Sequence, residues 1–211
     1  MGLLLVWQWL EENIKPLGAF KAALMGTAGV SDGEAVVLLS TQTASGASSV
    51  TFSSGITSAY SKYIFKGYNF NPGTNSVDGT FQFDAAGESG QNEVLTSVGF
   101  RQYHHENDGG SAGLGQFEGK SQGTTKETIF YQVGNEADEN AVGELLLYNP
   151  ASTTYVKHYQ THSNSHAVGA NDLSYEVMKG GYINTTAAIT SVSFHISSGV
   201  FDGKFKMWGV K

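Results

Sequence analysis

The fold class is decided by the stretch YSKYIFKGYNFNPG at positions 60–73. Aromatic and β-branched side chains recur through residues 60–70, a composition that is typical of β-strands. The run ends at Asn71-Pro72-Gly73, where proline and glycine favour the backbone angles of a tight turn. This stretch therefore predicts a strand that stops at a defined turn.

The residues on both sides of this stretch repeat the same pattern, in which short apolar runs are separated by turn residues. Strands are predicted over residues 35–43, 48–53, 97–105, 128–133, 144–148, 154–161, 176–185, 189–197 and 204–210, with one more around Phe81 and Phe83. Two glycine-rich polar stretches, 85–93 and 106–125, are expected to be long surface loops. About ten short strands at this spacing predict an all-β, antiparallel sandwich of two sheets.

The composition favours one domain without covalent cross-links. The chain has 211 residues, with 27 glycines, 3 prolines and no cysteine. A domain of this length buries about 70% of the surface of its unfolded chain, which is enough for a self-sufficient core. The net charge of -7, without any basic cluster, argues against nucleic acid and against an anionic membrane as partners.

The most apolar stretch is MGLLLVWQWL, at the start of the chain. It is unlike a secretory signal because Glu11 and Glu12 follow directly, and it is shorter than the ~20 apolar residues of a membrane-spanning helix. Residues 1–30 are predicted to form a short, apolar, helical arm ahead of a sandwich at residues 31–211. The arm residues expected to bind a partner protein are Leu3, Trp7, Trp9, Leu10, Ile14 and Phe20.

The apolar side of this arm has two possible packing partners. Leu3, Trp7 and Leu10 fall on one stripe of a helix, with Ile14 one turn further along. The stripe can pack on the chain's own sheet, or it can bury its side chains against another subunit. We favour the second interpretation because the rest of the chain already supplies a complete apolar core.

Catalytic motifs are weak in this sequence. Gly29-Val30-Ser31-Asp32-Gly33 matches the nucleophile-elbow pattern, which requires a strand before the serine and a helix after it. Here an apolar arm precedes Ser31 and a strand is expected to follow. We interpret the motif as a hinge, and we expect no enzymatic activity and no cofactor.

Metal ligands are equally sparse. His104, Glu106 and Asp108 are weak candidates at the end of a predicted strand, but His104 and His105 should point to opposite faces. His158, His162 and His166 recur every fourth residue, and the third is expected to lie in a loop beyond the strand. No metal site is therefore predicted.

The many aromatic residues allow two interpretations. Most alternate within the predicted strands and are expected to form the core or cross-strand pairs. A few, such as Tyr103, Tyr159 or Trp208, are candidates for a platform on which sugar rings stack.

Several framework segments resemble virion structural proteins of tailed bacteriophages of the marine type. They are VLLSTQT at 37–43, YSKYIFK at 60–66, LYNPASTTYVKH at 147–158, GYINTT at 181–186 and SGVFDGKFKMWGV at 198–210. The resemblance implies a jelly-roll-like sandwich on the surface of a particle, in a symmetric oligomer for which a trimer is favoured. It carries over no catalytic residue.

The resulting functional hypothesis is a structural protein of a bacteriophage particle, located in the virion. It would be a capsid decoration, fibre or tail component that docks through its arm on other virion proteins. The alternative is a carbohydrate-binding module for host attachment, with loop aromatics and the acidic segment 106–108 near the sugar. A polysaccharide hydrolase is a third hypothesis, without any local signature in the sequence.

Overall fold

The computed structural model describes residues 36–107, 110–167 and 173–211, and these residues form only strands and their connections. The twelve strands are β1 (Val36–Ala47), β2 (Ser49–Phe52), β3 (Lys62–Pro72), β4 (Val77–Ala85), β5 (Leu95–His105), β6 (Ala112–Gln116), β7 (Glu127–Val133), β8 (Ala141–Tyr148), β9 (Lys157–Ala167), β10 (Leu173–Ile183), β11 (Ile189–Ile196) and β12 (Phe201–Val210). In this part of the chain no helix is long and apolar enough to cross a membrane.

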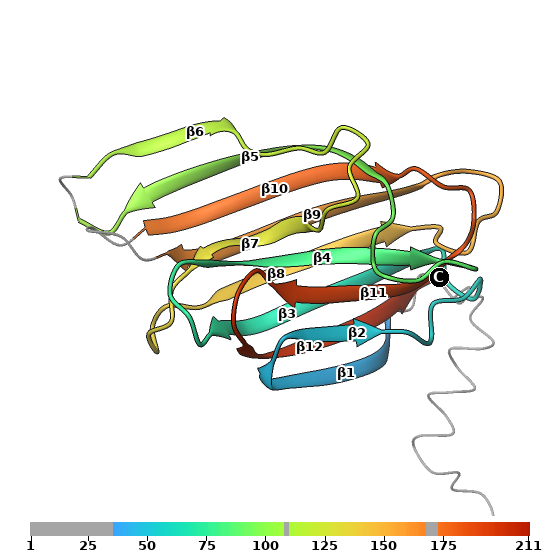
Figure 1. Cartoon of the computed structure of the whole chain (residues 1–211), viewed down its shortest axis with the longest axis horizontal. Helices are drawn as coiled ribbons and strands as arrows, with labels where there is room; N and C mark the ends of the chain where they lie inside the picture. Colours follow the sequence, from blue (N-terminus) through green and yellow to red (C-terminus); the bar gives the residue numbers. More distant parts are fainter. Residues whose placement is uncertain (1–35, 108–109, 168–172) are drawn as a thin grey trace, which may run out of the picture. The chain divides into compact units, whose positions relative to one another are not determined.

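The strands form two antiparallel layers (Figure 1). The large sheet has the order β1-β12-β3-β8-β9-β10-β5-β6, and the small sheet has the order β7-β4-β11-β2. One residue pair, Val133 with Ala167, links β7 to β9 and joins the two sheets at a corner. The predicted all-β sandwich is therefore confirmed.

The partners are nested along the chain. In the large sheet β3 pairs with β8, in the small sheet β4 pairs with β7, and back in the large sheet β5 pairs with β6. The two ends of the described chain repeat this pattern, because β1 pairs with β12 and β2 pairs with β11. Most partners are thus far apart in the sequence.

The core lies between the sheets and is rich in phenylalanine, as the alternating pattern predicted. Phe65, Phe81, Phe83, Phe194 and Phe205 are at most 2% exposed. Neighbouring rings meet edge to face or tilted, for example Phe52 on Phe65 with centroids 5.4 Å apart. Full burial of one such side chain contributes about 1.5–3 kcal/mol, so this core is sufficient to hold the two layers together.

A buried charge network fixes β5 and β10 to β7. The Lys179 ammonium lies 2.7 Å from Glu127, and both side chains are fully buried. Glu127 also accepts hydrogen bonds from Ser97 at 2.7 Å and from Tyr159 at 3.0 Å. Burial and the neighbouring Glu127 carboxylate raise the pKa of Tyr159, so its hydroxyl stays protonated and donates. Lys179 also lies 3.1 Å from the partly exposed Glu118, so both buried charges of the network have partners.

Two predictions about the loops are wrong. The stretch 106–125 contains β6, where Ala112-Gly113-Leu114-Gly115-Gln116 adds to the edge of β5. The glycines of β6 made this segment look like a loop, because glycine is rare in strands. Gly113 is needed here, since a Cβ at this position would lie 2.6 Å from the Tyr103 ring. β9 begins only at Lys157 and continues to Ala167, because pairing with β8 and β10 on both sides overrides the polar composition of Ser163-Asn164-Ser165.

Candidate functional site

The outward surface of the large sheet is the most unusual surface of the described chain. Side chains alternate between the two sides of a strand, so every second residue of this sheet points away from the core. We call this surface the open face. Its apolar members are Leu38, Ile64, Val98, Phe100, Leu114, Val142, Leu146, Met178 and Trp208, and its charged members are Lys66, Lys204, Lys206, Glu144 and Glu176.

The strand register brings apolar residues of the open face into one line. The paired residues across seven strands are Leu38, Trp208, Ile64, Leu146, Gln160, Gly180 and Val98. Leu38 is 50% exposed at one end of this line, and Val98 is 65% exposed at the other. A single sheet face with this much exposed apolar surface is typical of a binding surface.

The next line across the sheet is mixed in character. It contains Lys66, Glu144, His162, Met178 and Phe100, in that order. The ammonium of Lys66 lies 3.0 Å from the carboxylate of Glu144. His162 contacts the carboxylate of Glu176, which lies on the neighbouring strand β10. Charged and apolar groups therefore lie side by side, as they do in protein interfaces.

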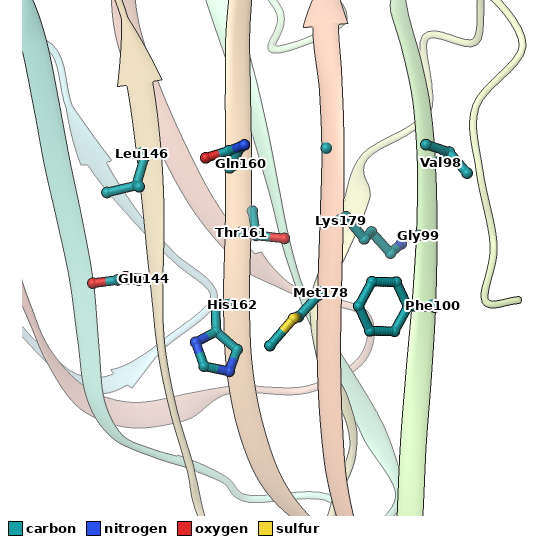
Figure 2. A pocket seen from close by; sticks show the side chains of 11 residues that line it. Val98, Gly99, Phe100, Glu144, Leu146, Gln160, Thr161, His162, Met178 and Lys179 are labelled. Atoms are coloured by element: carbon teal, nitrogen blue, oxygen red, sulfur yellow. The ribbon is translucent and has the colours of Figure 1, made fainter. Parts of the chain in front are cut away.

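A shallow hollow of about 500 Å³ spans parts of these two neighbouring lines. Figure 2 shows its lining side chains on four neighbouring strands, with Leu146 and Val98 at opposite sides. Gly180 has no side chain, so the surface is depressed between Gln160 and Val98. Further hollows of about 460 and 540 Å³ adjoin it around Asn164 and Glu176. The open face is thus a broad, gently uneven surface.

The open face was not found from the sequence. In β8 the run Leu145-Leu146-Leu147 puts apolar side chains on both sides of the strand, with Leu145 and Leu147 buried. On β5, Val98 and Phe100 put apolar side chains on the outward side, although their inward neighbours are not apolar. The signal was available in these runs, since a strand with one wet side normally alternates between apolar and polar residues.

The weak metal candidates do not form a site. His104 and His105 end β5, and Glu106 lies 3.5 Å from His166, while Asp108 lies outside the described residues. His166 lies on β9 and not in a loop, so His158, His162 and His166 share one side of that strand. Successive members are about 13 Å apart, too far to share an ion. Within the described residues, no group of three possible ligands is positioned to hold a metal.

Other candidates from the sequence are placed as follows. Tyr159 is 1% exposed and belongs to the core, so the expectation that it stacks on a sugar is wrong. Tyr103 points inward beside Tyr175, with ring centroids 5.9 Å apart, whereas Trp208 lies on the open face. The motif around Ser31 and the arm residues Leu3, Trp7, Trp9, Leu10, Ile14 and Phe20 lie outside the described residues.

Comparisons with known proteins give no relative to reason from. The chain matches no family model, and no curated protein or solved structure is significantly similar to it. A function must therefore be inferred from the geometry of the sandwich and its open face.

Proposed function

We propose that this protein is a non-enzymatic structural subunit of an assembled particle, and that its open face is buried against a second copy of the chain. The observation that carries this proposal is the line of apolar side chains across the large sheet, in which Val98 is 65% exposed. An isolated soluble sandwich would normally present polar side chains on that side.

The open face is large enough for a stable interface. Eight strands spaced about 4.8 Å apart are about 34 Å wide, and eight residues along a strand span about 26 Å. The resulting area is roughly 900 Å², which is comparable with the ~800 Å² that each partner buries in a standard interface. Leu114, 71% exposed on the edge strand β6, extends the apolar part to the rim.

Its charges favour pairing with a copy of itself. The lysines Lys66, Lys204 and Lys206 lie on β3 and β12, whereas Glu144 and Glu176 lie on β8 and β10. A two-fold axis parallel to the strands would place β3 of one copy opposite β10 of the other. Because such an axis keeps each residue's position along the strand, Lys66 would face Met178, two residues from Glu176, and Trp208 would face Val98. Such self-complementarity is what a two-fold interface requires.

The nested strand pairs support the finer assignment of a jelly-roll-like sandwich. A ribbon that runs β3:β8, β4:β7, β5:β6 changes sheet at each step, which is the winding of a jelly roll. Together with the framework segments that resemble phage virion proteins, this favours a bacteriophage particle as the assembly. The arm, residues 1–30, would dock the sandwich on other virion proteins, and the trimer suggested by the resemblance stays a prediction.

The mass of the protein in solution tests the pairing. We expect the full chain to sediment as an oligomer and the double variant Val98→Lys, Phe100→Lys to dissociate at least tenfold more readily, because two buried ammonium groups would be unpaired. Val200→Lys is the matched control, since Val200 is exposed but lies between β11 and β12. A monomeric wild-type chain, or equal loss in all variants, would contradict the proposal. The same masses separate a dimer from a trimer.

A deletion tests the role of the arm. A chain without residues 1–26 should keep the thermal unfolding transition of the sandwich, because residues 36–211 hold the whole described core. It should no longer join particles in a reconstitution assay. Normal incorporation of the shortened chain would disprove the docking role while leaving the open face untouched.

A further inference from the structure

Another hollow, of about 780 Å³, lies at the end of the sandwich where the chain passes from β8 to β9. Its walls include three tyrosines, Tyr60, Tyr148 and Tyr155, together with His158 at the start of β9. This volume falls within the range of about 300–1,000 Å³ that small-molecule sites occupy. The hollow shares no lining residue with the open-face hollow shown in Figure 2.

Tyr155 is the most exposed large apolar or aromatic side chain of the described residues, at 74%. Its turn is nevertheless well held, because the Ser152 hydroxyl accepts hydrogen bonds from the amides of Thr154 and Tyr155 at 3.3 and 3.2 Å. The Ser152 amide in turn donates to the Asn149 carbonyl at 3.0 Å. These bonds fix the backbone of the turn, so little backbone entropy is lost when the exposed Tyr155 ring stacks on a ligand.

The opposite wall is also fixed. The Tyr60 ring packs against the backbone of Gly209, where a Cβ would come within 2.5 Å of the ring, so this contact requires glycine. Tyr60 also meets Tyr63 edge to face, with centroids 5.8 Å apart. The amide of Asn149 donates to the Ser61 carbonyl at 2.7 Å and ties the two walls together.

The chemistry of the lining defines the ligand. Among the described residues that line it there is no Asp, Glu, Lys or Arg, and their polar groups are hydroxyls, an amide and the His158 imidazole. A phosphate or other anion would find no cation here, and a metal ion would find no carboxylate. Tyrosine rings offer flat faces to the C–H groups of a sugar, and serine and asparagine side chains pair with its hydroxyls.

We propose that this hollow is a binding site for neutral saccharides, with the Tyr155 ring as the stacking platform and Tyr60 and Tyr148 as the other walls. Tyr148 is held in place because its hydroxyl donates to Gln160 at 2.9 Å, which leaves its oxygen free to accept from a sugar hydroxyl. This site adjoins the open face, because Gln160 belongs to the line of residues across that face. It supports a glycan-binding role by residues other than the segment 106–108.

The test is a titration of the full chain with free neutral oligosaccharides, namely hexose and N-acetylhexosamine oligomers of several lengths, followed by calorimetry and tyrosine fluorescence. We expect at least one oligomer to bind and Tyr155→Ala to weaken it about tenfold or more. The matched control is Tyr68→Ala, on the open face, which should bind as the wild type does. Sulfated forms of the same oligomers should bind more weakly, because the hollow has no cation.

Three results would overturn the proposal. They are no binding of any neutral oligomer, equal loss in Tyr155→Ala and Tyr68→Ala, and tighter binding of the sulfated forms. Tyr155→Phe separates stacking from hydrogen bonding, since the phenyl ring keeps the platform and should retain most of the affinity. Because Tyr155 is exposed, both Tyr155 variants should unfold at the same temperature as the wild type, and this measurement excludes a loss of fold.

Discussion

The two outer surfaces of the sandwich differ sharply, although the inner surfaces are alike. On the small sheet the outward side chains are all polar: Thr51, Asp78, Thr80, Gln82, Asp84, Thr128, Ser191, Ser193 and His195. The chain itself satisfies several of them, as when Gln82 donates to the carbonyls of Glu93 and Thr124. We call this surface the polar face, in contrast to the open face.

The difference supports separate roles for the two surfaces. The polar face follows the normal alternation of a sheet with one wet side, and parts of the connecting segments 86–94 and 117–126 bond to it. The open face breaks that alternation along the line from Leu38 to Val98 and at a few further positions such as Phe100 and Leu114, whereas the outward side chains of β9 are all polar. Apolar side chains that no part of the described chain buries add nothing to the stability of the single chain, so their presence is best explained by a partner.

The largest expected effect lies between the sheets, beneath both surfaces. Glu127→Ala would leave the buried Lys179 ammonium with only the partly exposed Glu118 carboxylate, 3.1 Å away, and we expect the free energy of unfolding to fall by up to about 3–5 kcal/mol. The matched control is Glu144→Ala on the open face, where the partly exposed pair with Lys66 is worth about 1 kcal/mol or less. Urea unfolding of dilute protein measures both. Equal losses would show that the open face also contributes to folding.

A pair of glutamines compares the two outer surfaces directly. Gln82 is fully buried on the polar face, and Gln82→Ala would leave two carbonyls without a donor, at a cost of about 1–3 kcal/mol. Gln160 lies on the open face and accepts only from Tyr148, so Gln160→Ala should cost about 0.5 kcal/mol or less. Thermal unfolding of the two variants measures the difference, and a larger loss at Gln160 would break the comparison.

The smallest effect is a dependence on pH. Burial, aided by Lys126, lowers the pKa of His195 on the polar face to about 4. The unfolded chain therefore takes up the proton first, near pH 6.5, and stability should be lost as the pH falls from 6.5 towards 4. After allowance for partial exposure we expect a contribution of about 1 kcal/mol.

The variant His195→Gln isolates this contribution, because glutamine does not titrate. Its unfolding free energy should decline less than that of the wild type between pH 6.5 and pH 4, when both are measured by urea titration. Gln160→Ala, on the open face, is the matched control, because it removes no titratable group and should follow the wild type. An unchanged slope in His195→Gln would show that His195 takes up its proton equally in the folded chain.

Sequence patterns predicted most of the strands because they depend on local alternation and turns. The stretch 60–73 became β3, and Phe81 and Phe83 are fully buried on β4, as expected. What failed depended on neighbours in space. β6 needed the edge of β5 to exist, and the polar end of β9 needed partners on both sides.

The candidate sites were harder to predict for the same reason. The open face arises from a register that spans seven strands, which no single segment contains. Tyr155 was placed in a predicted strand over 154–161, but Ser152 holds it in the turn before β9. Which aromatics lie outside the core could not be inferred from alternation alone, as the buried Tyr159 shows.

The pairing of β1 with β12 also has a consequence for how the protein is made. β12 lies between β1 and β3, so two strands near the beginning of the sandwich lack their shared neighbour until the chain reaches Val210. At a synthesis rate of 5–20 residues per second, the interval between Leu38 and its partner Trp208 lasts about 10–30 s. During that time the phenylalanine-rich surfaces emerge from the ribosome without cover. The sandwich can therefore close only after β12 has been made, and its yield in cells should depend on chaperones that shield nascent β-strands.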